Sequence, residues 1–247
     1  YGQTRNLKNA LANSINTISA RLIDQVGPKA VVTLMKKMGI TSYLPEVPSI
    51  ALGTPDISLY EVVGAYSTFA NKGIYIEPIF ITRIEDKNGV PIFEVIPKTS
   101  DVLSEEAAYV TLNLMEGVTN YGSGGRLRHS GLEKTSYIYK NLITGYPYEF
   151  KNAIAGKTGT AQIKSLTDQD LTVREEYEGI RKDIKNRDHA LFASYGPVPD
   201  PNLVVVVIVE NGESGSAVAA PIAKLLIEQY QININESWVT EILLIIP

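Results

Sequence analysis

The sequence predicts an α+β protein in which helices flank an antiparallel β-sheet. Predicted helices and strands lie in separate stretches of the chain rather than alternating, which favours an antiparallel sheet. Leu203–Val209 is a run of seven apolar residues that follows a Pro-Asp-Pro turn, as expected of a buried strand. Hydrophobic residues make up 44% and charged residues 20% of the 247 residues, which is typical of a globular chain and excludes general disorder.

Apolar spacing predicts two helices near the N-terminus. Apolar residues three or four apart mark one amphipathic helical region: Leu7, Leu11, Ile15, Ile18, Leu22 and Val26. Thr4 is placed to cap its start, and Gly27-Pro28 ends it and begins a second helix near Lys29–Met38. Gly39 stands where a helix C-cap is expected.

Capping residues mark the starts of two further helices. Ser58, with Glu61 three residues later, is a capping box. Ser104 is followed by two glutamates, which suit the first turn of a helix. These signals predict helices over about 58–71 and 104–118, and the three prolines of residues 45–57 predict a loop before the first of them.

Extended segments follow in the middle and in the second half of the chain. Ile74–Glu85 and Val90–Ile96 are rich in β-forming residues, and the turn Asp86–Gly89 between them predicts a hairpin. Three neighbouring antiparallel strands and a closing helix packed on them are predicted over Ala153–Gln162, His189–Tyr195, Leu203–Glu210 and Ser216–Tyr230.

Three segments are predicted to be loops. Gly122–Gly125 is glycine-rich and predicts a flexible turn. Tyr137–Phe150 holds five aromatic residues among Asn, Gly and Pro, which indicates a packed loop over a cleft. Residues 164–188 hold six positive and seven negative charges among 25 residues and predict a solvated excursion.

Composition limits the function classes. The 27 acidic residues outnumber the 23 basic ones, and the net charge of −4 argues against a nucleic-acid-binding surface. The longest apolar run, of seven residues, is far too short to span a bilayer. The lack of cysteine excludes thiolate chemistry and disulfides and suits a bacterial extracytoplasmic protein. The chain starts with Tyr1 rather than Met, so we expect it to be part of a longer, processed protein.

We expect neither a metal nor a cofactor. The sequence contains no cluster of metal-ligating residues, and it lacks the nucleophile elbow of Ser–His–acid hydrolases. His129 and His189 have charged or loop residues as neighbours, and we expect both to be structural or exposed.

Two glycine-containing segments fail as nucleotide-binding motifs. Gly156-Lys157-Thr158 could end a phosphate-binding loop only if a glycine stood at position 151, which is Lys151. Gly122-x-Gly124 fails as a dinucleotide fingerprint because Leu127 stands where a glycine is required. Nucleotide binding is therefore disfavoured.

Two short motifs remain as candidate sites. Lys157-Thr158-Gly159-Thr160 at a strand edge offers a cation and two hydroxyls to an anionic, extended ligand, and the glycine leaves room for its approach. Backbone N–H groups on such an edge can also stabilise a developing oxyanion. Ser14-Ile15-Asn16, taken by itself, is more typical of a polar helix face or a helix cap.

Taken together, the two motifs resemble two of the three motifs of penicillin-binding proteins and serine β-lactamases, with Ser14-Ile15-Asn16 preceding Lys157–Thr160. The segment 6–17 resembles the helix–loop–helix around the Ser-x-Asn motif of class A penicillin-binding proteins, and segments 51–58 and 65–73 are similar to the same class. The Gly122–Gly125 loop continues this resemblance in order. Segments 188–197 and 209–222 look more like class B enzymes.

The resemblance also divides the chain. It is class A-like over residues 1–162 and class B-like over about 188–230, which implies a transpeptidase domain over 1–230 and an unassigned C-terminal tail over 231–247. The third family motif, Ser-x-x-Lys, carries the nucleophilic serine, and no serine in this chain has lysine at the third following position. The expected fold is therefore penicillin-binding protein-like and incomplete at its N-terminal side.

The family resemblance implies a function. It implies a D,D-transpeptidase that cross-links peptidoglycan by acyl transfer from D-Ala-D-Ala stem peptides and is inhibited by β-lactams. It further implies action at the periplasmic face of the bacterial inner membrane, with the parent protein anchored upstream of this chain. This fragment alone would be inactive because it lacks the nucleophile.

The resemblance also assigns roles to six residues. Ser14 would relay a proton, Asn16 would hold the substrate amide, and the charge of Lys157 would keep a neighbouring amine neutral and favour the substrate carboxylate. Thr158 and Thr160 would bind the substrate carboxylate, with the Thr160 N–H as half of the oxyanion hole and Gly159 between them. Two alternatives stay open: a non-catalytic penicillin-binding-like module that binds a peptide or a protein partner, and, less favoured, a β-lactamase.

Overall fold

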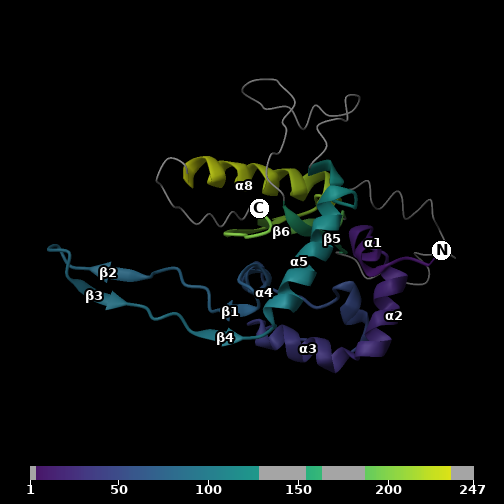
Figure 1. Cartoon of the computed structure of the whole chain (residues 1–247), viewed down its shortest axis with the longest axis horizontal. Coiled ribbons are helices and arrows are strands. Elements are labelled where there is room, and N and C mark those ends of the chain that lie inside the picture. Colours follow the sequence, from purple (N-terminus) through teal and green to yellow (C-terminus); the bar gives the residue numbers. More distant parts are fainter. Residues whose placement is uncertain (1–3, 128–153, 163–186, 235–247) are drawn as a thin grey trace, which may run out of the picture.

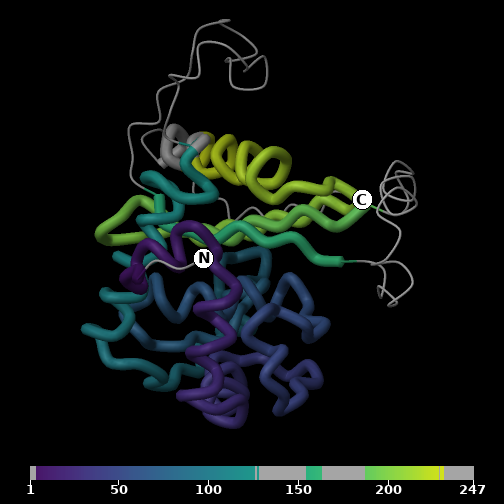
Figure 2. The backbone as a smooth tube through the Cα atoms, turned by 90° about the vertical axis from the view of Figure 1, so that its right-hand side faces the viewer, coloured from purple at the N-terminus to yellow at the C-terminus, as the bar shows by residue number. Residues whose placement is uncertain are grey.

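The computed structural model describes residues 4–127, 154–162 and 187–234. The aromatic segment Tyr137–Phe150, His129 and all but the last two residues of 164–188 lie outside the described residues. Figures 1 and 2 show a β-sheet with α8 on one face and a layer of helices on the other. None of the described helices is long and apolar enough to cross a membrane.

In chain order the described elements are α1 (Leu7–Ala12), α2 (Asn16–Val26), α3 (Pro28–Lys37), the 3-10 helix η1 (Pro48–Leu52), α4 (Leu59–Ala70), β1 (Ile74–Ile76), β2 (Arg83–Glu85), β3 (Pro91–Glu94), β4 (Thr99–Asp101), α5 (Glu105–Asn120), the 3-10 turn η2 (Gly125–Leu127), β5 (Ala155–Ala161), β6 (His189–Gly196), β7 (Leu203–Val209), the π-helical turn η5 (Gly215–Ala219) and α8 (Ala220–Ile234).

Strands β5, β6 and β7 form an antiparallel sheet in that order, which confirms the prediction for this part of the chain. The central strand β6 is buried from Phe192 to Gly196 and pairs on both sides, with Ser194 opposite Gly156 and Val205. Because β5 lies at the edge, its outer side has no strand partner among the described residues. An extended ligand could therefore pair with β5 as an added strand.

The closing helix packs on this sheet as predicted, although its ends differ. A π-helical turn, Gly215–Ala219, comes first, and α8 then continues to Ile234, past the predicted end at Tyr230. Side chains of α8 and of the sheet share one buried apolar cluster, which consists of Leu127, Ile154, Ala190, Phe192, Val205, Val207, Ala219, Ala220, Ala223 and Ile227. On the opposite face, Tyr195 and Ala155 pack against Leu112 and Met115 of α5.

The N-terminal helical region is broken at Ser14, which agrees with the helix–loop–helix that the family resemblance implies around the Ser-x-Asn motif. Helix α1 ends at Ala12 and α2 starts at Asn16, because Ser14 has a left-handed backbone conformation that a right-handed helix cannot contain. Thr4, by contrast, is not the N-cap. The Asn6 side chain accepts the N–H of Asn9 and caps α1 instead.

The capping box of α4 is confirmed, and its glutamate has a second function. Glu61 Oε2 accepts the N–H of Ser58, and Ser58 Oγ accepts the N–H of Glu61, as the motif requires. The same buried carboxylate accepts the backbone N–H groups of Thr41 and Ser42, and both of their hydroxyls, at 2.6 to 2.9 Å. Glu61 therefore joins α4 to the turn that follows α3.

The predicted hairpin is real, but it is divided into two short ladders. At its base β1 pairs with β4, and further out β2 pairs with β3, so Ile74–Glu85 is not one strand. Pro78 follows β1 and has no N–H with which to continue the ladder. Figure 1 shows the outer ladder extending away from the body as an arm.

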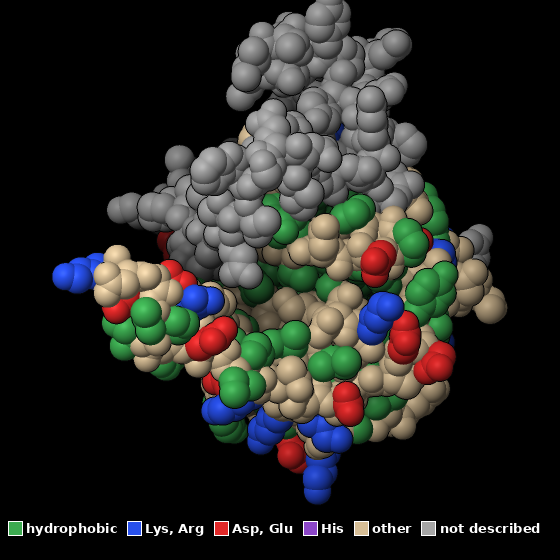
Figure 3. All heavy atoms as spheres, turned by 60° about the vertical axis from the view of Figure 1, so that its left-hand side comes forward, with side chains coloured by type: hydrophobic (Ala, Val, Ile, Leu, Met, Phe, Trp, Pro, Cys, Tyr) green, Lys and Arg blue, Asp and Glu red, His purple; other side chains and the backbone are tan. Residues whose placement is uncertain are grey.

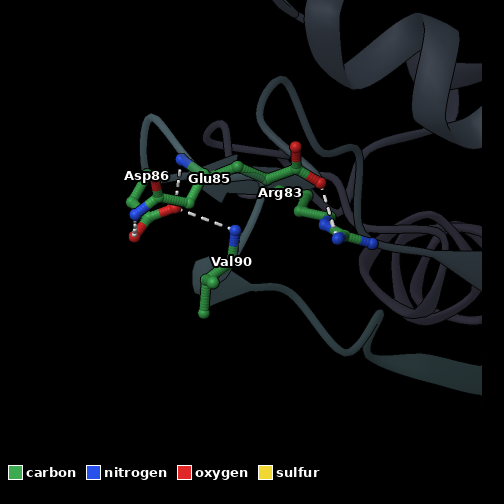
Figure 4. Close-up of polar contacts among 5 residues, drawn as sticks. Arg83, Glu85, Asp86 and Val90 are labelled. Atoms are coloured by element: carbon green, nitrogen blue, oxygen red, sulfur yellow. Dashed lines mark hydrogen bonds and ion pairs between the residues drawn. The ribbon is translucent and has the colours of Figure 1, made fainter.

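The arm, residues 77–98, contacts α4 near its base, where Tyr60 stacks on Phe80 and donates to Pro78 O at 2.9 Å, and its tip is held by local contacts. At the turn, Asp86 accepts the N–H groups of Asn88 and Val90 at 2.8 and 2.9 Å (Figure 4). Arg83 and Glu85 form an ion pair at 2.6 Å on the same strand (Figure 4). Every residue of β2 and β3 is exposed, and hydrophobic side chains are visible on the surface of the arm (Figure 3).

Candidate active site

Ser14 lies in a tight connection that its neighbours define. The N–H of Ile15 donates to Ala10 O and the N–H of Ser14 donates to Leu11 O, which is the Schellman pattern that ends a helix. The residue at the left-handed position of this pattern is usually glycine, whereas here Ser14 occupies it with φ 53°. The connection leaves the Ser14 side chain exposed between α1 and α2.

Lys157 comes to Ser14 from the edge strand of the sheet. Its Nζ donates to Ser14 Oγ at 2.8 Å and to the carbonyl oxygen of Thr158 at 2.9 Å. Burial of Lys157 lowers the pKa of its ammonium group. The predicted contact between the Ser14 hydroxyl and the Lys157 ammonium is confirmed.

The remaining predicted site residues lie on the same two segments. Asn16 is the first residue of α2, and Thr160 lies two residues beyond Thr158 on β5; both are exposed. Their side chains make no hydrogen bond to another described residue. The structure thus brings Ser14, Lys157 and Thr158 into one contact network and leaves Asn16 and Thr160 free to meet a ligand.

Ser123 is a site residue that the sequence reasoning missed. Its Oγ lies 2.7 Å from Thr158 Oγ1, and its backbone N–H donates to Ala12 O at 2.8 Å. The glycine-rich turn Gly122–Gly125 is predicted to be flexible and to belong to the family resemblance, but no role is assigned to Ser123. Its hydroxyl among glycines, in a turn that resembles the family, is the signal that could have identified it.

Gly159 is backed by a second glycine. A Cβ atom on Gly215, in the turn before α8, would overlap the backbone oxygens of Gly159 and Leu191. In the loop that precedes this turn, the N–H of Asn211 donates to Nδ1 of His189, the first residue of β6, at 3.0 Å. That bond fits the expected structural role of His189, and the close approach fixes the path of β5 at Gly159.

The geometry favours proton transfer and anion binding. Ser14 Oγ accepts a hydrogen bond from Lys157 Nζ, so the proton of the Ser14 hydroxyl is available to another acceptor. Lys157 contributes positive charge beside an open strand edge. Within the described residues, no three His, Asp or Glu side chains lie close enough to hold a metal ion.

Comparisons with known proteins agree with this geometry. The family model described as the penicillin-binding protein transpeptidase domain matches residues 1–228. Penicillin-binding protein 1A of Aquifex aeolicus is 36% identical over 126 residues, which are 51% of this chain and 17% of that protein. Penicillin-binding protein 2D of Bacillus subtilis is 35% identical over 156 residues, which are 63% of this chain and 20% of that protein.

Solved structures show the same fold. The D,D-transpeptidase domain of a peptidoglycan glycosyltransferase from Eggerthella lenta superposes with a TM-score of 0.65 at 19% identity, covering 93% of this chain and 54% of that one. Penicillin-binding protein A of Mycobacterium tuberculosis, solved as a penicillin G acyl-enzyme complex, gives 0.61 at 19%, covering 90% and 48%. The chain spans about half of these solved chains and a fifth or less of the two curated relatives.

The family model covers nearly the whole chain, and the α+β fold with its antiparallel sheet is that of the structural neighbours. The chain therefore belongs to the penicillin-binding protein transpeptidase family.

Proposed function

We propose that this chain is the part of a D,D-transpeptidase that binds the D-Ala-D-Ala end of a peptidoglycan stem peptide and delivers protons during acyl transfer. The observation that carries the proposal is the hydrogen bond from Lys157 Nζ to Ser14 Oγ at 2.8 Å, which joins the two family motifs. The open edge of β5 supports it, because an extended peptide can lie along that edge.

In this mechanism the nucleophile comes from a Ser-x-x-Lys segment outside these 247 residues. That serine gives its proton to the lysine of its own motif, and its oxygen attacks the carbonyl carbon of the penultimate D-Ala. When the C–N bond breaks, the leaving amine takes a proton from Ser14, and Lys157 returns one to Ser14. The lowered pKa of Lys157 makes this return easier.

The other site residues bind the ligand. Asn16 holds the substrate amide, and the hydroxyls of Thr158 and Thr160 bind the terminal carboxylate beside the charge of Lys157. The Thr160 N–H is half of the oxyanion hole, and a donor of this kind is worth about 3 kcal/mol in the transition state. Gly159 leaves the space through which the ligand approaches the strand.

The proposal includes where the protein acts and what inhibits it. Its substrates are peptidoglycan stem peptides, so it acts at the periplasmic face of the inner membrane, held there by an anchor upstream of this chain. β-Lactams inhibit it as mimics of the D-Ala-D-Ala unit. The acyl-enzyme structure of a family member with penicillin G supports this assignment.

The open edge of β5 also supports a second candidate function, a non-catalytic module that binds a peptide or a protein partner along that edge. The two functions differ in one respect, because only the transpeptidase forms a covalent acyl-enzyme.

Intact-mass spectrometry with a fluorescent penicillin tests the proposal. We expect the 247-residue chain to gain no mass and the full-length protein to gain one penicillin. In the full-length protein, Lys157→Ala should slow acylation by roughly a hundredfold or more, since it removes a proton-transfer partner. No acylation of the full-length protein would favour the non-catalytic module, and acylation of the 247-residue chain would place the nucleophile within it.

A further inference from the structure

Ser123 contacts both halves of the candidate site. Its backbone N–H donates to Ala12 O at 2.8 Å, two residues before Ser14. Its hydroxyl lies 2.7 Å from the hydroxyl of Thr158, the residue after Lys157. Together with the Lys157–Ser14 hydrogen bond, these contacts close a ring that holds the end of α1 against β5.

The turn around Ser123 is held on both sides of the serine. A Cβ atom on Gly122 would overlap the backbone of Ala12, so the turn lies directly on the end of α1. The N–H of Gly124 donates to Val118 O at 2.9 Å, which ties the turn to α5 as well. These contacts fix the backbone at Ser123, and its hydroxyl reaches that of Thr158 from this fixed backbone.

Each of the two hydroxyls has one proton, and either can donate to the other. If Ser123 donates to Thr158, the proton of Thr158 is free for a ligand. If Thr158 donates to Ser123, Thr158 offers only lone pairs, which repel an anion. An anionic ligand therefore selects the first arrangement, and hydrogen bonds linked in this way strengthen one another.

We infer that Ser123 is a positioning residue that turns the Thr158 hydroxyl proton toward the carboxylate of the ligand and so sets the preference for carboxylate-bearing substrates. This inference rests on the proposed function, because it needs a ligand carboxylate beside Thr158. Ser123 itself touches no reacting atom; it acts through Thr158.

The test compares two ligands that differ only in the carboxylate. Acylation of the full-length protein by benzylpenicillin and by its methyl ester is followed by intact-mass time courses, which give a second-order rate constant for each. The variants are Ser123→Ala, Ser123→Thr and the control Ser67→Ala, whose hydroxyl donates to Val63 O within α4. Thermal unfolding of each variant identifies any that fail to fold.

We expect Ser123→Ala to lower the rate constant for benzylpenicillin by about threefold to tenfold, the value of one lost hydrogen bond, and to leave that for the ester unchanged. Ser123→Thr, which keeps the hydroxyl, should restore the rate, and Ser67→Ala should match the wild type. An equal loss with both ligands, or no loss with either, would overturn the inference. Failure of the wild-type protein to be acylated would instead overturn the proposed function, and this inference with it.

Discussion

Ser14 keeps a left-handed backbone conformation that costs an L-residue roughly 1–2 kcal/mol. The Schellman pattern at the end of α1 would be satisfied by glycine, and glycine is the common choice there. A hydroxyl at this position therefore costs stability. Strain of this kind is typical of functional sites, where the side chain is needed and the surrounding structure holds it in place.

This cost can be measured by comparing two variants that both lack the hydroxyl. Ser14→Gly and Ser14→Ala each remove the partner of Lys157, so their difference reports the backbone alone. We expect Ser14→Gly to be the more stable of the two by roughly 0.5–1 kcal/mol in urea unfolding, because glycine relieves the left-handed strain.

Ser67 provides a control at which the stability difference between the glycine and alanine variants is expected to have the opposite sign. It lies inside α4, where glycine is less favourable than alanine by about 1 kcal/mol, so Ser67→Gly should be the less stable variant. If the glycine and alanine variants had the same order of unfolding free energy at Ser14 as at Ser67, the assignment of strain to Ser14 would be contradicted.

At the scale of the elements, the path of β5 depends on the turn before α8. Gly215 approaches the backbone of Gly159 so closely that a Cβ atom would overlap it. We expect Gly215→Ala to displace β5 or the turn, to lower the free energy of unfolding by about 1–3 kcal/mol and to weaken ligand binding at Thr160. Gly125→Ala is the control, because a Cβ atom there meets nothing within 4 Å; equal behaviour of the two variants would be contrary evidence.

The joint between α4 and the turn after α3 should depend on pH. Hydrogen bonds to Glu61, first from the Ser42 hydroxyl and then from Ser58 and Thr41, hold its pKa well below the usual value of 4.5. A depressed folded-state pKa means that this stabilisation is complete above about pH 5 and is lost as the pH falls.

Glu61→Gln tests this joint. We expect it to cost about 2 kcal/mol at neutral pH and to flatten the fall in unfolding free energy between about pH 5 and pH 3. Glu85→Gln, which changes an exposed carboxylate paired with Arg83, should leave that slope unchanged. A slope that stays steep in Glu61→Gln would show that other carboxylates cause it.

The sequence predicted most elements because their signals are local. The capping box at Ser58, the apolar run of β7 and the turn at Asp86–Gly89 each act within a few residues, and all three are present in the structure. The break at Ser14 follows from the family resemblance and not from the apolar spacing, because apolar residues continue at helical spacing across it. Ser123 was missed because its role depends on Thr158, 35 residues further along the chain.

For the whole molecule, we expect the protection of backbone amides against hydrogen exchange to fall from the sheet to the arm. β6 is paired on both sides and buried, whereas all residues of β2 and β3 are exposed. In native-state hydrogen exchange we expect the amides of β6 to be among the slowest, and those of β2 and β3 to exchange orders of magnitude faster, because a two-stranded hairpin is only marginally stable. Equal protection in both would indicate that another surface covers the arm.

The pairing of β1 with β4 at the base of the arm makes the arm a permissive site for insertion. This ladder holds the two ends of residues 77–98 together, so lengthening the turn at the tip, beyond the contact of Phe80 with Tyr60, does not affect the packing of the body. Lengthening such a loop costs only about 0.6 kcal/mol per doubling. A peptide tag or a small domain placed between Asn88 and Gly89 would thus leave the Ser14–Lys157 contact intact, and would provide an attachment point for a fluorophore or a surface.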